Sequence, residues 1–395
     1  MPGEFLIFGV TLAGVAIFHR RALPIAALGL LAVIAFKWAG AGFAGGDGFT
    51  GLAAHFAHEW VVLANLFLLL VGFALLAAHF EASRLPKALP RYLPDDWTGA
   101  FALLAIVFVV SGFLDNIAAA LIGGAMAHTL FRGRVRVGYL AAIVAASNAG
   151  GAGSVIGDTT TTMMWISGVS PLAVLHAYVA SVAALLVFGP AAARAQQRFA
   201  PIARDADHAL AIDWARVAIV GIILASAVAV NIGVNAAHPD ASGRFPFIGS
   251  AVALSTVLTA GWRRPDWGIL PGAVTGSIFL LCLVASASLM PVKSLPSPSW
   301  QTALLLGFVS AFFDNIPLTA LALAQGGYDW GVLAYAVGFG GSMLWFGSSA
   351  GVAICNMIPE ARSTGRWLKE GWLIPVAYVA GFTVLIATLG WAPRG

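Results

Sequence analysis

Charged side chains are scarce in this sequence: Asp, Glu, Lys and Arg make up 10% of its 395 residues, and hydrophobic residues make up 60%. A soluble domain carries about 25% charged residues. The scarcity therefore excludes a soluble globular protein, and the mean hydropathy of +0.89 predicts a polytopic membrane protein embedded in the lipid bilayer. The formal net charge of +4 then indicates basic cytoplasmic loops, so no nucleic-acid partner is expected.

Cysteine is nearly absent. Cys282 and Cys355 both lie in apolar surroundings, which excludes a disulfide framework and a cysteine metal site. No basic residue precedes the first apolar segment, which therefore indicates a retained membrane helix and not a cleaved signal peptide. No polar stretch is long enough to predict a soluble domain.

Long apolar runs, by contrast, recur along the whole chain. A membrane helix needs about 20 apolar residues, and fewer if it is broken. The predicted spans are 4–18, 23–43, 60–82, 171–193, 215–235, 246–261, 267–289 and 371–391. Two more segments, 97–131 and 299–327, hold an Asp-Asn pair at their middles, and another two, 137–168 and 330–358, are interrupted by glycine-rich polar runs.

Basic residues set the orientation, because Lys and Arg concentrate in cytoplasmic loops. With the N-terminus outside, most of the 21 basic residues lie inside; the exceptions are Lys37, Arg244, Lys293 and Arg394. Segment 97–131 has basic loops at both ends and is predicted to enter and leave from the cytoplasm, whereas 299–327 enters from outside.

The sequence thus predicts an all-α protein with inverted-topology repeats, two re-entrant hairpins and two broken helices. The first repeat is 1–200, a polar cytoplasmic linker is 201–214, and the second repeat is 215–395.

The clearest sign of a repeat is a duplicated motif. Ser111-Gly-Phe-Leu-Asp-Asn-Ile117 returns 199 residues later as Ser310-Ala-Phe-Phe-Asp-Asn-Ile316. An ionised carboxylate inside a membrane costs at least ~2.5–3.5 kcal/mol without compensation, so two such pairs indicate a function. Asp and Asn also cap helix N-termini, and capping is compatible with ion binding.

The glycine-rich runs repeat as well, at an offset of 190 residues, and the run that ends at Asp158 has Ser348 in the matching place. The first half therefore has an additional acid. Broken helices free carbonyl oxygens, and nearby amides and hydroxyls add oxygen ligands that suit a hard cation. The candidate ion- or substrate-binding residues are Asp115, Asn116, Ser147, Asn148, Gly150, Gly151, Asp158, Thr159, Thr160, Asp314, Asn315, Ser348 and Ser349.

Within this set, a sodium site is predicted at Asp115, Asn116, Asn148 and Asp158. A proton can compete for the same carboxylate, because burial disfavours the charged form. Na⁺ and H⁺ would then be cargo, and no resident cofactor is expected.

With these residues identified, the chain resembles the NhaD-type sodium/proton antiporters of the ion transporter superfamily. The matching pieces are Asp115-Asn-Ile, the run from Ser147 to Thr161, Asp314-Asn-Ile-Pro and Gly347-Ser-Ser-Ala-Gly-Val-Ala353. The resemblance implies a homodimer in a plasma membrane (the bacterial inner membrane) with a scaffold part and a moving, elevator-like transport part. It also implies that Asp115, Asn148, Asp158 and Asp314 are candidates for the ion site.

Three alternatives are open. Sodium-coupled uptake of citrate or a dicarboxylate is favoured by the partly positive helix N-termini at the hairpin tips, but an acid at each tip would repel such an anion. An intramembrane aspartyl protease needs two acids sharing a proton, and nothing indicates a peptide-sized gate. A passive channel is disfavoured because hairpin tips that meet at mid-membrane indicate occlusion. The sequence therefore predicts a transporter and not an enzyme.

Overall fold

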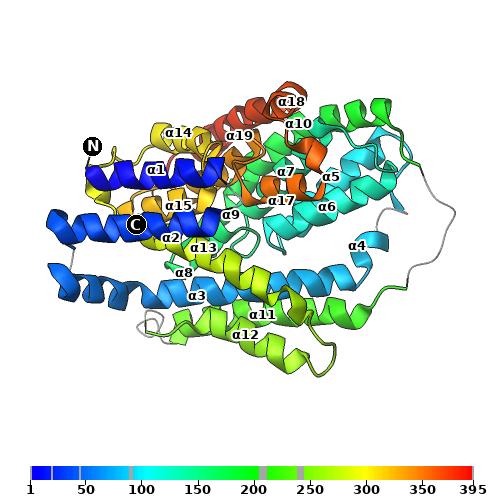
Figure 1. Ribbon diagram of the computed structural model, residues 1–395. Helices are drawn as coiled ribbons and strands as arrows, with labels where there is room; N and C mark the ends of the chain where they lie inside the picture. The colour runs from blue at the N-terminus through cyan, green and yellow to red at the C-terminus, as the bar shows by residue number, and fades with distance from the viewer. Residues whose placement is uncertain are drawn as a thin grey trace. The chain divides into compact units, whose positions relative to one another are not determined.

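The computed structural model describes residues 2–18, 21–43, 46–88, 92–203, 211–237 and 244–393. In these ranges the chain is helical, and its only β-type pairing is one isolated bridge between Phe43 and Gly46 (Figure 1). The predicted all-α polytopic membrane fold is confirmed. Five described helical stretches are long and apolar enough to cross a bilayer, or six if one bent pair is counted as a single span. Residues 204–210 of the predicted linker, and the basic residues Arg20, Arg91, Arg204 and Arg394, lie outside the described residues.

The chain folds as two compact units. Unit 1 comprises Met1–His79, Ala215–Pro296 and Ile316–Gln325. Its main helices are α1 (Gly3–Ile17), α2 (Ala22–Phe36), most of α3 (Gly48–Ala82), α11 (Trp214–Ala237), α12 (Phe247–Thr259), α13 (Leu270–Ser288) and most of α15 (Asn315–Gln325). Inside this unit the Asn65 side chain of α3 accepts a hydrogen bond from the backbone N–H of Gly249 at the start of α12 (2.9 Å).

Helix α3 is longer than the span predicted at 60–82. It begins at Gly48 and has 35 residues, which at 1.5 Å per residue gives about 52 Å against about 30 Å of bilayer hydrocarbon. Its first turns carry polar residues but no proline that would end the helix.

Unit 2 comprises Phe80–Trp214, Ser297–Asn315 and Gly326–Gly395. Its first-half helices are α4 (Leu85–Ala88), α5 (Trp97–Ser111), α6 (Asn116–Leu130), α7 (Val137–Ala152), α8 (Thr159–Ile166), α9 (Pro171–Leu175) and α10 (Ala177–Phe199). Its later helices are α14 (Trp300–Ser310), α16 (Trp330–Gly340), α17 (Ser349–Met357), α18 (Thr364–Glu370) and α19 (Leu373–Leu389).

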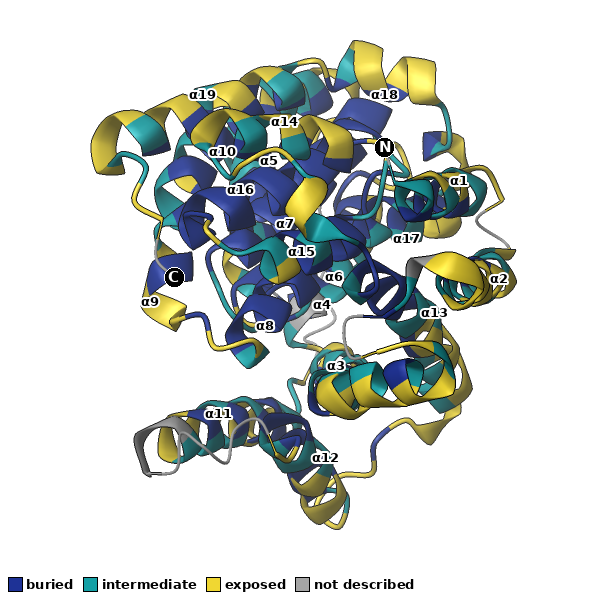
Figure 2. Cartoon of the chain, turned by 90° about the vertical axis from the view of Figure 1, so that its left-hand side faces the viewer, coloured by how far each residue is buried: buried dark blue, intermediate teal, exposed yellow. Residues whose placement is uncertain are grey.

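Helices α7 and α16 form the core of unit 2. Every residue of both helices is buried, as Figure 2 shows in dark blue. The two helices contact each other, α5, α6 and α10 surround α7, and α14 and α19 cover α16. A helix that is apolar on all sides belongs either in a protein core or in lipid, and these two helices are enclosed by other helices of unit 2. The last turns of α7 and α16, which lead into the two breaks, are therefore buried inside unit 2.

All four segments expected to be interrupted are interrupted. Non-helical residues separate α5 from α6 at 112–115, α7 from α8 at 153–158, and α14 from α15 at 311–314. Between α16 and α17 the chain makes a short 3₁₀ turn (Gly341–Met343) and then runs without helix over 344–348. The re-entrant course of the hairpins and the inverted orientation of the halves stay predictions.

Candidate functional site

Asp158 is the most deeply buried acid at these breaks, with 2% of its surface exposed. It precedes α8 as the N-cap, and its Oδ1 accepts a hydrogen bond from the backbone N–H of Thr160 (2.9 Å). The preceding Gly157 allows a close backbone approach, because a Cβ there would lie 2.1 Å from the carbonyl oxygen of Ser111. The cap therefore holds a carboxylate where water has little access.

Two asparagine amides converge on this carboxylate. Asn116 Nδ2 donates to Asp158 Oδ2 (3.3 Å), and Asn315 Nδ2 lies 3.4 and 3.3 Å from Oδ1 and Oδ2. Asn116 and Asn315 are the first residues of α6 and α15, and both are buried. No Lys or Arg of the described chain forms an ion pair with Asp158. All its donors are neutral, so an ionised Asp158 leaves a buried charge that a cation or proton would compensate.

Asn148 joins the two broken helices. It lies near the end of α7 and is fully buried. Its Oδ1 accepts from Asn116 (3.0 Å), and its Nδ2 donates to the hydroxyls of Ser342 (2.9 Å) and Ser348 (3.2 Å). Asn148 thus connects the Asp158 cluster to the break between α16 and α17.

The other two acids, Asp115 and Asp314, lie beside the cluster, and each contacts a hydroxyl group. Asp115 caps α6 through the N–H of Ile117 (3.2 Å), and the Thr159 hydroxyl lies 3.5 Å from its other oxygen. Asp314 accepts from the Ser349 hydroxyl (2.6 Å). Both acids are partly exposed. Asp115, Asp158 and Asp314 interact electrostatically, so their negative charges repel one another and favour a bound cation.

The contacts around the two breaks recur in pairs. The Ser111 hydroxyl donates to the carbonyl oxygen of Ser147 (2.6 Å), and the Ser310 hydroxyl donates to that of Val337 (2.7 Å). Ser111 and Ser310 differ by 199 residues and Ser147 and Val337 by 190, which are the offsets of the repeated motifs. The pairs Asp115–Thr159 and Asp314–Ser349 follow the same two offsets. The largest chemical difference is at the caps, where Asp158 begins α8 and Ser348 begins α17.

The remaining predicted residues include Ser147, Gly150, Gly151 and Thr160, and the first three contact backbone carbonyl groups near the cluster. Ser147 donates its hydroxyl to the carbonyl of Val144, away from Asp158. Gly150 lets α5 approach, because a Cβ would lie 1.9 Å from the Phe108 carbonyl oxygen, and Gly151 lies against the carbonyl of Gly157. Thr160 is fully buried, and its hydroxyl has no hydrogen-bond partner in the described chain. It is therefore a polar group available to a bound ion.

The predicted sodium ligands are only partly in mutual contact. Asn116, Asn148 and Asp158 are linked by hydrogen bonds, whereas Asp115 bonds to Thr159 and Ile117. Within the described ranges no group of three His, Cys, Asp or Glu side chains is placed to hold a metal ion. The side chains that do converge carry carboxylate, amide and hydroxyl groups, and groups of these kinds offer oxygen ligands that suit a hard cation.

Two contacts of the site were absent from the predicted set. Ser342 accepts from Asn148, and the buried indole of Trp367 donates to the Ser342 carbonyl oxygen (3.2 Å). The glycine run around Ser342 was a signal for its role. Nothing in the local sequence near Trp367 indicates this contact.

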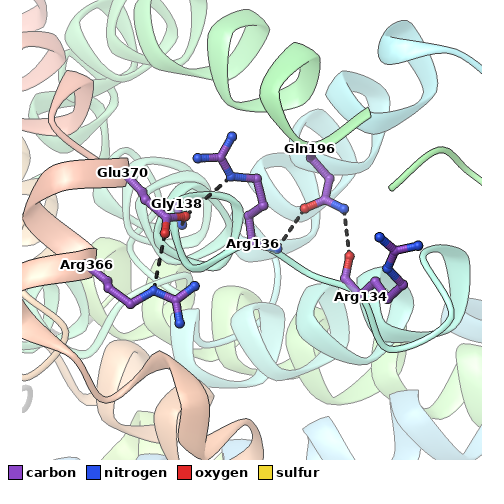
Figure 3. Close-up of polar contacts among 6 residues, drawn as sticks. All are labelled: Arg134, Arg136, Gly138, Gln196, Arg366 and Glu370. Atoms are coloured by element: carbon purple, nitrogen blue, oxygen red, sulfur yellow. Dashed lines mark hydrogen bonds and ion pairs between the residues drawn. The ribbon is translucent and has the colours of Figure 1, made fainter. Parts of the chain in front are cut away.

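At the start of α7 a group of charged side chains surrounds Glu370 (Figure 3). Its carboxylate accepts from the Gly138 N–H (3.2 Å) and contacts Arg136 Nε (3.4 Å) and Arg366 Nε (3.3 Å). Burial would raise the pKa of the Glu370 carboxyl, but the Gly138 N–H and the two guanidinium groups outweigh burial and hold that pKa below its usual value. Glu370 precedes the span at α19 and is charged at neutral pH.

Comparison with known proteins finds two similar chains. Over 306 residues the chain is 26% identical to sodium/proton antiporter 1 of Arabidopsis thaliana, a match that covers 64% of this chain and 49% of that protein. Over 312 residues it is 27% identical to sodium/proton antiporter 2 of the same plant, covering 70% of this chain and 71% of that protein. The match thus spans about half the length of the first relative. No protein-family model matches the chain.

Proposed function

We propose that this protein is a sodium/proton antiporter that exchanges Na⁺ or Li⁺ for H⁺. The observation that carries the proposal is the buried carboxylate of Asp158, which is hydrogen-bonded only by neutral donors from Asn116, Asn315 and Thr160. A carboxylate in this setting needs one positive charge, and a proton and a sodium ion can each supply it. The names of the two Arabidopsis relatives support the same activity.

Exchange follows from competition at one group. When Asp158 is protonated, it is neutral and no longer offers its own charge to Na⁺. When the proton leaves, the Asp158 carboxylate binds the cation, and the side chains of Asn116 and Asn148 turn their amide oxygens towards it. Thr160, next but one to Asp158 in the chain, adds its buried hydroxyl. Because the two ions exclude each other, each is carried in a separate half-cycle.

The membrane setting completes the proposal. Two inverted repeats with re-entrant hairpins would bring the tip asparagines to mid-membrane, where broken-helix transporters bind their ions. The part of the chain that carries the site would move across the bilayer against a scaffold part, in an elevator-like cycle. The protein would act as a homodimer in a bacterial inner membrane, with its N-terminus outside.

Vesicles test the activity. Purified protein is reconstituted with an imposed acid-inside pH gradient, and Na⁺, Li⁺ or K⁺ is added outside. The expected result is proton efflux with Na⁺ or Li⁺ and none with K⁺. No sodium response anywhere between about pH 6 and 9, the range in which a buried aspartate titrates, would contradict the proposal.

Sodium-coupled transport of an organic anion is the second candidate. It is favoured by α17, which begins at the site with the uncharged cap Ser348 and so presents a partly positive helix end. The starts of α6 and α8 are less suitable, because Asp115 and Asp158 already neutralise them. Sodium-dependent uptake of labelled citrate or succinate by the same vesicles, without proton efflux, would establish this alternative.

A further inference from the structure

Trp367 of the short helix α18 contacts a residue of the proposed cation site. Trp367, at the middle of α18, has 1% of its surface exposed, and its indole Nε1 donates to the backbone carbonyl of Ser342 (3.2 Å). Ser342 is the residue whose hydroxyl accepts from Asn148 (2.9 Å). Trp367 therefore bonds to the backbone of a residue whose side chain belongs to the site network.

A second indole fastens the same break to the beginning of α18. Trp345, which follows the 3₁₀ turn of the break, donates its Nε1 to the hydroxyl of Thr364 (3.0 Å). The break between α16 and α17 is thus bonded to α18 at two points, Ser342 and Trp345. Such a segment lacks its own helical hydrogen bonds, so external bonds decide its position.

The other end of α18 is fixed to α7. Glu370 accepts from the Gly138 N–H and contacts Arg136, at the first turn of α7 (Figure 3). The packing is close, because a Cβ at Gly138 would lie 2.7 Å from the Glu370 carbonyl oxygen. On the far side of the same loop, Gln196 accepts from the Arg136 N–H (2.8 Å) and donates to the Arg134 carbonyl (2.9 Å). The start of α7 is therefore held firmly against α18.

Helix α7 carries Asn148 near its far end, and α18 holds Ser342. We propose that α18 sets the separation of Asn148 and Ser342, and that Trp367 is a positioning residue for the cation site. A site needs its groups held within about 0.5 Å of the productive geometry. Without the indole N–H, the Ser342 backbone would lose its anchor, Asn148 would lose its shorter hydroxyl contact, and the Asn116–Asp158 pair would lose its support. This inference rests on the proposed function for the identity of the bound ion, whereas the contacts of Trp367 and Ser342 do not depend on that function.

The test removes the indole N–H and keeps an aromatic side chain at this position. Trp367→Phe is expected to raise the Na⁺ concentration for half-maximal exchange by about 10-fold, the lower end for contacts that orient metal ligands. The maximal rate should stay within about twofold, because Asp158 and the asparagines are unchanged. Trp372→Phe is the matched control, since Trp372 lies five residues further on and is 59% exposed.

A double substitution shows whether Trp367 acts through Ser342. Ser342→Ala removes the hydroxyl that Asn148 contacts. If the two residues act through one contact, the double variant Trp367→Phe/Ser342→Ala should need no higher Na⁺ concentration for half-maximal exchange than the weaker-binding single variant. Additive effects would overturn the route through Ser342.

Hydrogen exchange of residues 341–348 gives a readout that is independent of transport. Trp367→Phe should speed exchange of these amides at least about threefold relative to Trp372→Phe, because the segment opens more easily. Equal exchange in the two variants would overturn the proposal, as would faster exchange with an unchanged half-maximal Na⁺ concentration. If the parent protein shows no sodium response, the proposed function fails, and the exchange measurement alone decides whether Trp367 positions the break.

Discussion

Asn315 donates its side-chain amide to the carboxylate of Asp158, a residue 157 positions earlier in the chain. Asn116, the corresponding residue of the first motif copy, donates to the same carboxylate. A single acid is therefore shared by both copies of the Asp-Asn motif. In the second half Ser348 takes the place of Asp158, so of these two caps only the one in the first half is an acid.

Asp158→Asn is expected to abolish sodium-dependent proton efflux, to below about 1% of the parent rate, a larger loss than outer contacts cause. The asparagine keeps a carbonyl oxygen for the tip amides but carries no exchangeable charge. Vesicle assays measure the loss, and the melting temperature checks folding. Glu360→Gln, at an exposed acid of unit 2, is the control and should leave the rate unchanged. Proton efflux at the parent rate in Asp158→Asn would remove Asp158 from the mechanism.

Asn315→Ala should raise the half-maximal Na⁺ concentration by about 10-fold, because Asp158 loses one of its two side-chain donors. Asn116→Ala should do the same or more, since Asn116 also bonds to Asn148. Gln301→Ala, at an exposed amide on α14, is the matched control. An Asn315→Ala variant with unchanged Na⁺ dependence would show that the first half binds the ion alone.

The sequence was sufficient to predict the helical fold and the four breaks, because membrane helices follow from apolar length and breaks follow from glycine and polar runs. It also pointed to the acids and amides of the cluster, since polar groups inside apolar segments are few. It did not predict that Asn315 would bond to Asp158 while Asp115 bonds to Thr159. Nor did it indicate Trp367, because such contacts depend on how distant helices cross and leave no local pattern.

Gly150→Ala should destabilise the fold by about 1–3 kcal/mol, the cost of overpacking a dense core. The added Cβ would meet the Phe108 carbonyl oxygen at 1.9 Å, so α5 and α7 would have to separate. Gly221→Ala is the control, because Gly221 lies inside α11 with no heavy atom within 4 Å of its added Cβ. Thermal unfolding in detergent measures both, and equal melting temperatures would contradict the close approach.

Glu370→Gln should lower the melting temperature at neutral pH but not in acid. The pKa of Glu370 is lowered in the folded protein, so its charge stabilises the fold above the unfolded pKa of about 4.3. That stabilisation is lost as pH falls through the folded-state value. The parent and the variant should therefore converge only after the pH has fallen below the folded-state pKa, which is itself below the ordinary value of about 4.3. A difference in melting temperature that does not change with pH would show that packing, and not charge, holds Glu370.

The most direct test of the central claim is proton release on sodium binding, measured with purified protein in weakly buffered detergent solution without any gradient. If one carboxylate holds either ion, adding Na⁺ to the protonated protein should release about one proton per chain, as cation binding to a titrating ligand does. Asp158→Asn should release none, and K⁺ should be ineffective with both proteins. Sodium binding without proton release, or equal release from Asp158→Asn, would contradict the account.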